Sequence, residues 1–132
     1  MEIQEFRVVL RARDFVQTNR FYGEVLGLPG LASWDSESGR GALYQAGSGL
    51  VEVRGRPSLP AGSLSSDEFS YQGPLHKMTL TLSVPSAEKA YEELLFRDRN
   101  IPGGLKEQPD GKLCFETHDP DGIKILFLAN GD

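Results

Sequence analysis

Residues 113–128 read Leu-Cys-Phe-Glu-Thr-His-Asp-Pro-Asp-Gly-Ile-Lys-Ile-Leu-Phe-Leu. Two short β-prone runs flank the central Asp-Pro-Asp-Gly segment, in which proline fixes φ, aspartate can bond the turn backbone and glycine tolerates a positive φ. The stretch therefore predicts a β-hairpin. Because strand side chains alternate between two faces, the second strand is predicted to carry an apolar row and an opposite row. These rows are Ile123, Ile125 and Phe127 on one face, and Lys124, Leu126 and Leu128 on the other.

The overall composition predicts one globular domain over residues 1–132. The chain is 39% hydrophobic and 25% charged, it has no apolar run of membrane-spanning length, and we expect no secretory signal from the residues at its start. A lone cysteine, Cys114, favours a reducing, cytoplasmic setting. The net charge of −5 argues against nucleic acid as the main partner. We therefore expect no nucleic-acid and no membrane partner.

Strand and helix patterns occur in the same order in both halves of the chain. In residues 1–54, an alternating strand precedes Asp14, which with Gln17 forms a helix capping box, and three short strands follow the helix. In residues 75–130, an alternating strand precedes Ser86 as the helix cap, and the hairpin supplies closing strands. Residues 55–74 form a long linking loop rich in Gly, Pro and Ser. The sequence thus predicts an α+β fold of two tandem βαβββ modules.

Four short motifs resemble those of a known superfamily that unites glyoxalases, bleomycin resistance proteins and extradiol dioxygenases, the vicinal oxygen chelate proteins. The motifs are Arg-Asp-Phe at 13–15, Phe-Tyr-Gly-Glu-Val-Leu-Gly-Leu at 21–28, Val-Glu-Val at 51–53 and Asp-Pro-Asp-Gly at 119–122. The resemblance implies a cup-shaped, curved mixed sheet with helices outside, a ligand inside, and a homodimer.

The resemblance also implies where a metal would be held. In the glyoxalase branch, one residue from the first strand and one from the fourth strand of each module, typically His and Glu, bind the ion. The matching positions here are Arg7, Glu52, Thr79 and Leu126. Only Glu52 could be a ligand, whereas a catalytic divalent site normally needs about three protein donors. We therefore expect no metal and no cofactor. We interpret His76, His118 and Cys114 as packing or surface residues.

Alternation also assigns the inner face of the predicted cup. If the apolar rows pack under the helices, the opposite rows line the cavity. The apolar rows are Phe6, Val8, Leu10, Val51, Val53, Met78, Leu80, Leu82, Ile123, Ile125 and Phe127, and the inner rows are Arg7, Val9, Arg11, Leu50, Glu52, Arg54, Lys77, Thr79, Thr81, Lys124, Leu126 and Leu128. The inner rows hold five cations and one carboxylate, which predicts a small anionic ligand with an apolar body.

Ten residues are the resulting ligand-binding candidates: Arg7, Val9, Arg11, Trp34, Glu52, Arg54, Thr79, Thr81, Lys124 and Leu126. Trp34 and Tyr44 could equally be core aromatics or ligand contacts. In the simpler interpretation, Arg7 and Glu52 pair with each other where the metal ligands stood, and the remaining cations are solvated at the rim.

Three functions remain open. The first is a metal-free binding protein for a small molecule. The second is an enzyme of the same superfamily, a lyase, isomerase or dioxygenase, with an unconventional metal set or with Glu52 as base and Arg7 polarising an oxygen. The third is a protein-interaction module that uses the loop at 55–74. We favour binding over catalysis, because a carboxylate held beside an arginine is a weak base.

Overall fold

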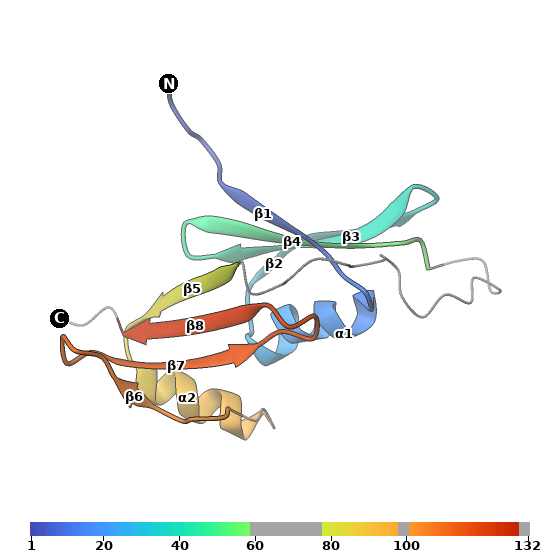
Figure 1. Ribbon diagram of the computed structural model, residues 1–132. Helices are drawn as coiled ribbons and strands as arrows, with labels where there is room; N and C mark the ends of the chain where they lie inside the picture. The colour runs from blue at the N-terminus through green and yellow to red at the C-terminus, as the bar shows by residue number, and fades with distance from the viewer. Residues whose placement is uncertain (59–77, 98–100, 130–132) are drawn as a thin grey trace. The chain divides into compact units, whose positions relative to one another are not determined.

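Each half of the chain forms a four-stranded mixed sheet with the same order of elements in the computed structural model (Figure 1). The structure describes residues 1–58, 78–97 and 101–129. The chain divides into two units, Met1–Gln72 (unit 1) and Gly73–Asp132 (unit 2). Most of the predicted linking loop, together with His76 and Lys77, lies outside the described residues.

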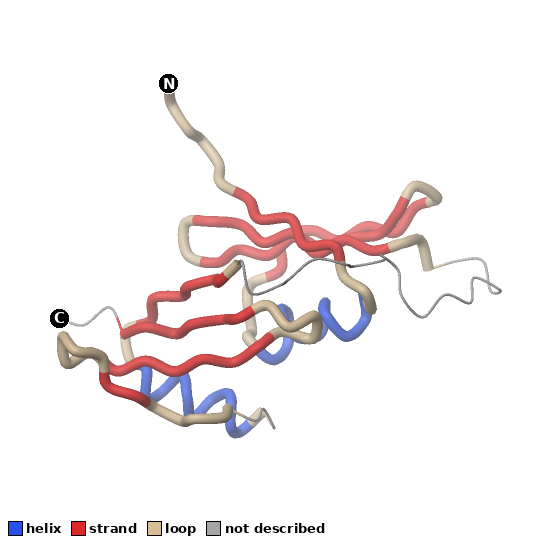
Figure 2. The backbone as a smooth tube through the Cα atoms, viewed as in Figure 1, coloured by secondary structure: helices blue, strands red, loops and turns tan. Residues whose placement is uncertain are grey.

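Unit 1 contains one parallel and two antiparallel strand pairs, and its sheet has the order β1-β4-β3-β2. Its elements are β1 (Arg7–Arg11), α1 (Phe15–Arg20), the π-helical segment η1 (Phe21–Val25), β2 (Gly30–Ser36), β3 (Gly39–Ala46) and β4 (Gly49–Gly55). The first and last strands of the unit are the parallel pair, and the two antiparallel pairs join β4 to β3 and β3 to β2. Figure 2 distinguishes these strands from the helices and loops of the chain.

Unit 2 repeats this plan with the order β5-β8-β7-β6. Its elements are β5 (Thr79–Val84), α2 (Ala87–Phe96), β6 (Lys106–Glu107), β7 (Leu113–His118) and β8 (Lys124–Ala129). Again the first and last strands pair in parallel, and the others pair antiparallel. The α+β class and the tandem βαβββ order predicted from the sequence are therefore confirmed. Within the described residues, no helix has the length and apolar character needed to cross a membrane.

The two predicted helix caps are present. The side chain of Asp14 accepts a hydrogen bond from the backbone N–H of Gln17 at 3.1 Å. The hydroxyl of Ser86 accepts one from the backbone N–H of Lys89 at 3.2 Å. Each cap satisfies a donor that the first helical turn leaves without a partner, which explains why the helices begin where they do.

The predicted hairpin is β7 and β8, and Asp119 organises its turn. One carboxylate oxygen, Oδ1, accepts hydrogen bonds from the backbone N–H groups of Asp121 and Ile123, both at 2.9 Å. Asp119 is 4% exposed, and Gly122 has a φ of +91°. The buried carboxylate thus stabilises the turn through these two hydrogen bonds, and Gly122 adopts the positive φ that the turn requires.

Of the predicted apolar rows, Leu10, Val51, Val53, Ile123, Ile125 and Phe127 are buried, Val8, Leu80 and Leu82 are half-buried, and two residues are exposed. The ring of Phe127 stacks on Phe115 with centroids 4.6 Å apart. Phe6 and Met78, in contrast, are 67% and 42% exposed, so their predicted burial is wrong. Both stand one residue before the first residue of an edge strand, β1 or β5.

The first helix of unit 1 does not remain an α-helix throughout its length. It changes at Phe21 into η1, in which the N–H of Leu26 bonds to the carbonyl of Phe21, five residues earlier, at 2.9 Å. Here β3 approaches the helix closely, because Gly23 has no side chain: a Cβ added there would lie 2.8 Å from Oη of Tyr44. Tyr44 is buried, and its hydroxyl donates to Asn19, both to the carbonyl at 3.3 Å and to Oδ1, so the structure places this side chain in the core.

Candidate functional site

One face of the unit 1 sheet packs toward the core. The strand register identifies which residues lie on the opposite face. β1 aligns with β4 so that Val9 is opposite Glu52 and Arg11 is opposite Arg54. β3 and β2 extend these rows across the sheet. We call this side the open face of unit 1; its residues are Arg7, Val9, Arg11, Ala32, Trp34, Gly41, Leu43, Gln45, Leu50, Glu52 and Arg54.

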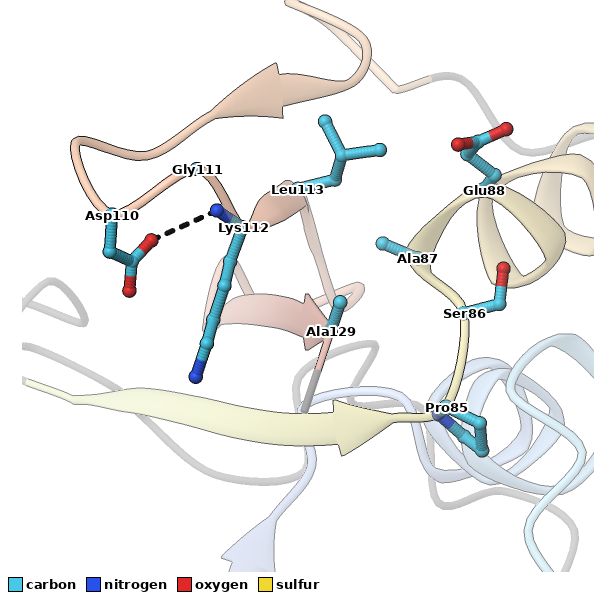
Figure 3. A pocket seen from close by; sticks show the side chains of 9 residues that line it. All are labelled: Pro85, Ser86, Ala87, Glu88, Asp110, Gly111, Lys112, Leu113 and Ala129. Atoms are coloured by element: carbon cyan, nitrogen blue, oxygen red, sulfur yellow. Dashed lines mark hydrogen bonds between the residues drawn. The ribbon is translucent and has the colours of Figure 1, made fainter. Parts of the chain in front are cut away.

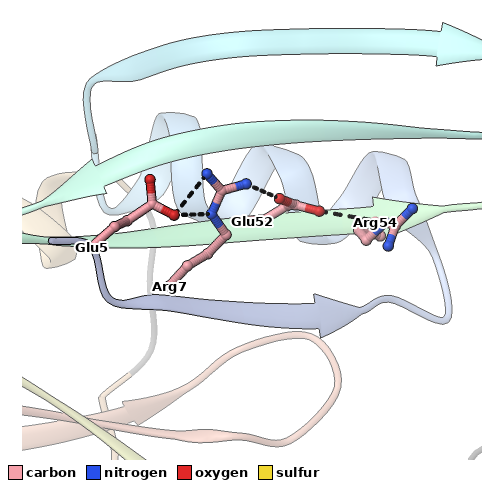
Figure 4. Close-up of polar contacts among 4 residues, drawn as sticks. All are labelled: Glu5, Arg7, Glu52 and Arg54. Carbon is pink, nitrogen blue, oxygen red and sulfur yellow. Dashed lines mark hydrogen bonds and ion pairs between the residues drawn. The ribbon is translucent and has the colours of Figure 1, made fainter. Parts of the chain in front are cut away.

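Four charged residues on and beside this face form a continuous chain of ion pairs (Figure 4). Nη1 of Arg7 lies 2.6 Å from Oε1 of Glu52, and Nε of Arg54 lies 3.4 Å from Oε2 of the same carboxylate. Arg7 also binds Glu5, with Nη2 and Nε both 3.0 Å from Oε2. Both oxygens of Glu52 are thus engaged by guanidinium groups.

The environment of Glu52 explains this arrangement. The residue is only 7% exposed, and a carboxylate so far from water needs charged or hydrogen-bonding partners. The hydrogen bond to Glu52, together with the charge of Glu5, raises the pKa of Arg7 above its ordinary value. The pairing of Arg7 with Glu52 that the sequence suggested is present, whereas the part played by Glu5 was missed.

Arg11 differs from the other arginines of the open face. Its side chain is exposed and has no ion pair or hydrogen bond with any residue that the structure describes. Val9, beside it in β1, is 42% exposed. Within the part of the chain that the structure describes, the guanidinium of Arg11 is therefore open to an anion.

Trp34 lies on the same face, in the outermost strand β2, and is 37% exposed. It is opposite Gly41, and a Cβ added to that glycine would lie 2.4 Å from Cζ2 and 2.6 Å from Cε2 of the indole. The six-membered ring therefore lies over the backbone of β3. Sequence reasoning selected Trp34 but missed Gly41, because the signal is a cross-strand pair that appears only once the register is known.

In unit 2 the predicted residues again share one face, which we call the open face of unit 2. Thr79 is opposite Lys124, and Thr81 is opposite Leu126. Nζ of Lys124 lies 3.1 Å from Oε2 of Glu116 in β7, a carboxylate that the sequence analysis did not place on this face. Both threonines are exposed.

The predicted excess of positive charge is therefore smaller than the sequence suggested. Glu5 and Glu116 neutralise charge beside Arg7 and Lys124, and Lys77 lies outside the described residues. Alternation along a strand identified the correct face but could not identify Glu116, which lies on a neighbouring strand. Glu5, two residues before Arg7, follows the same alternation and could have been found. Arg11 is the described inner-row cation without such a partner.

The register shows that the four positions compared with the glyoxalase metal ligands are equivalent within the two units. In unit 1, Arg7 is opposite Leu50, two residues before Glu52. In unit 2, Thr79 is opposite Lys124, two residues before Leu126.

The donor chemistry of these positions does not fit a divalent cation. A guanidinium donates hydrogen bonds only, and a leucine side chain has no lone pair. Among residues 1–58, 78–97 and 101–129, no three His, Cys, Asp or Glu side chains gather as a metal ion would require.

His118 and Cys114 have different surroundings. His118 is exposed at the end of β7, and Cys114 is a buried free cysteine in the same strand.

A pocket in unit 2 involves none of the predicted residues (Figure 3). It lies between the start of α2 and the turn before β7, where Oδ1 of Asp110 accepts from the backbone N–H of Lys112 at 3.0 Å. The lining residues are Pro85, Ser86, Ala87, Glu88, Asp110, Gly111, Lys112, Leu113 and Ala129. The hydroxyl of Ser86 is already used to cap α2.

Comparison with known families identifies one that spans nearly the whole chain. The model of the Glyoxalase/Bleomycin resistance protein/Dioxygenase superfamily matches residues 6–127. A search of curated proteins found no match.

Solved structures share the fold at low sequence identity. Lactoylglutathione lyase from Agrobacterium tumefaciens is 12% identical with a TM-score of 0.67, and the alignment covers 98% of this chain and 95% of that one. TioX from Micromonospora sp. ML1 is 18% identical with a TM-score of 0.72, covering 98% and 100%. A superfamily member from Sphaerobacter thermophilus DSM 20745 is 18% identical with a TM-score of 0.65, covering 98% and 99%.

Proposed function

Because this chain belongs to the Glyoxalase/Bleomycin resistance protein/Dioxygenase superfamily, we propose that it binds a small anionic organic molecule on the open face of unit 1, without the metal of the glyoxalase branch. The single observation that carries the proposal is the ion pair of Arg7 with Glu52 at 2.6 Å. This ion pair supports a metal-free site. The guanidinium of Arg7 stands at the position of β1 where the glyoxalase branch has a metal ligand, and the carboxylate of Glu52 balances its charge.

Anion binding is supported by Arg11. Its guanidinium is exposed and has no described partner, whereas Arg7 and Arg54 are held by Glu52. An arginine fork can bind a carboxylate or phosphate through two parallel hydrogen bonds. The apolar side chains of Val9 and Leu43 beside the arginines suit an organic body rather than an inorganic ion.

The test is a binding screen of small organic carboxylates and phosphates against the wild type and a double variant, Arg11→Gln with Arg54→Gln. We expect at least one anion to bind the wild type and to bind the double variant about tenfold more weakly, the loss of one or two charge-assisted hydrogen bonds. Lys112→Gln, a change outside the open face, serves as the matched control. Unchanged binding of every anion by the double variant contradicts the proposal.

A metal assay tests the second part of the proposal, that the protein binds no metal of the glyoxalase type. Protein purified without chelators should contain far less than one Fe, Mn, Ni or Zn per chain. Stoichiometric metal would contradict the metal-free proposal.

Catalysis by Glu52 receives no support from the site. Its two oxygens already contact Arg7 and Arg54, so a substrate proton would have to compete with two guanidinium groups.

A further inference from the structure

Trp34 and two arginines occupy a single row across the open face of unit 1. We infer that this row binds a planar aromatic molecule with one anionic group, its ring stacked on Trp34 and its anion held by Arg11 and Arg54. The inference rests on the proposed function and narrows its ligand class.

The first step is the placement of the indole. Gly41 lets the ring lie over β3, since any side chain there would collide with Cζ2 at 2.4 Å and Cε2 at 2.6 Å. One ring face thus rests on the sheet, and Trp34 remains 37% exposed. A flat, exposed indole is a surface on which another aromatic ring can stack, with offset or edge-to-face geometry.

The second step is the distance to the charges. The register runs from Trp34 to Gly41, then to Arg54 and Arg11, on β2, β3, β4 and β1. Neighbouring strands lie about 4.8 Å apart, so the Arg54 and Arg11 backbones are roughly 10 and 14 Å from that of Trp34. Because the indole already extends over β3, one bicyclic ring system with a carboxylate can span the remaining gap.

The third step is charge. Arg54 makes its ion pair to Glu52 at 3.4 Å through Nε, and Arg11 has no partner among the residues described. A guanidinium presents five N–H donors in a plane, so an ion pair leaves donors for a second anion. Leu43, in the adjacent row, supplies an apolar contact beside the ring.

The experiment uses the full chain and three matched probes. These are 2-naphthoate, its saturated counterpart decahydro-2-naphthoate, and the uncharged 2-naphthylmethanol. Trp34 is the only tryptophan, so its indole N–H gives one signal in a ¹⁵N-labelled sample, and that signal reports directly on the proposed site. We expect 2-naphthoate to shift it at lower concentration than either other probe.

Variants then separate the two contacts, with affinity measured by calorimetry. We expect Trp34→Leu to weaken 2-naphthoate about fivefold and Trp34→Phe to retain most of the affinity, in line with the strength of aromatic pairs. Arg11→Gln should reduce the preference for 2-naphthoate over 2-naphthylmethanol. If Trp34→Leu fails to fold by circular dichroism, the comparison of 2-naphthoate with decahydro-2-naphthoate on the wild type still decides the question.

The outcomes distinguish the inference from the function on which it rests. Equal affinity for 2-naphthoate and decahydro-2-naphthoate, or full affinity in Trp34→Leu, overturns the aromatic inference and leaves anion binding intact. If neither these probes nor any anion of the wider screen binds, the proposed function fails as well.

Discussion

Gly23 is a single residue whose missing side chain determines how the helix and the sheet of unit 1 meet. A Cβ there would lie 2.8 Å from Oη and 3.1 Å from Cε1 of Tyr44. We expect Gly23→Ala to lower the free energy of unfolding by about 1–3 kcal/mol, the usual cost of overpacking a core. Urea unfolding followed by circular dichroism measures this.

Gly30→Ala is the control for that substitution. A Cβ at Gly30 would meet Cε1 of Tyr44 at 3.9 Å, an ordinary contact, so its effect should be small. Since the closest clash of Gly23→Ala is with the hydroxyl, adding Tyr44→Phe should cost less than the sum of the two single changes. Strict additivity would show that the clash is not the cause.

Arg7 and Arg11 share a strand and a face but differ in their partners. Without ligand, Arg7→Leu should lower the urea midpoint clearly, because Glu52 is nearly buried and would lose its 2.6 Å contact. Arg11→Leu removes no described ion pair and should have little effect. Equal midpoints for the two variants would show that the Arg7–Glu52 pair adds no stability.

At the scale of elements, the β7–β8 hairpin depends on one carboxylate. Asp119→Ala removes the acceptor for two backbone N–H groups at 2.9 Å, and we expect a loss of about 1–3 kcal/mol. Asp119→Asn keeps an acceptor oxygen and should lose less. Asp110→Ala, at an exposed turn with one such bond, is the control, and all three are compared by urea unfolding.

A second element-scale contact joins β2 to the chain after β4 and predicts a pH dependence. The hydroxyl of Ser58 donates to Oδ2 of Asp35, and its N–H donates to Oδ1 at 3.3 Å. These bonds, with a smaller effect of the Arg40 charge, lower the pKa of Asp35. Since folding favours the carboxylate, this stabilisation is present above the unfolded pKa of about 3.9 and is lost as the pH falls through the lowered folded value.

Ser58→Ala should therefore destabilise the protein at pH 7 by more than it does at pH 2. Urea midpoints of wild type and variant, compared at both values, provide the measurement. Because the Asp35 carboxylate is exposed, the difference should be small. A difference that grows toward acid would contradict the assignment.

The π-helical segment η1 is a feature of an element that sequence patterns do not predict. Phe15, Tyr22 and Val25 have helical spacing in the sequence, and all three are buried, so this spacing marks the buried face of the segment. Spacing alone could not show that the chain changes to five-residue hydrogen bonds at Phe21.

At the scale of the whole molecule, periodicity and punctuation predicted the tandem element order and the face of each strand, because both are local properties. Register is not local, so the bond of Glu116 with Lys124 and the placement of Trp34 over Gly41 were missed. The bond of Glu5 with Arg7 is local, since the residues are two positions apart, and alternation could have found it. The two ion pairs lower the net positive charge of the candidate site, and the pair of Trp34 with Gly41 determines where the indole lies.

We predict that the protein is a homodimer, as the family resemblance implies. Size-exclusion chromatography with light scattering should give twice the mass of the 132-residue chain at micromolar concentration. A mass equal to one chain at all concentrations would contradict this prediction.

The outermost strand of unit 1 has a consequence for handling the protein. All seven residues of β2 are exposed, and within the described part of the chain it has a hydrogen-bonded neighbour on one side only. Such a border invites further strands and hence aggregation. The irregularity between Gly30 and Ala32 interrupts the ladder, and a bulge of this kind discourages stacking of copies. A change that removed the irregularity between Gly30 and Ala32 would make the β2–β3 ladder more regular and the protein less soluble.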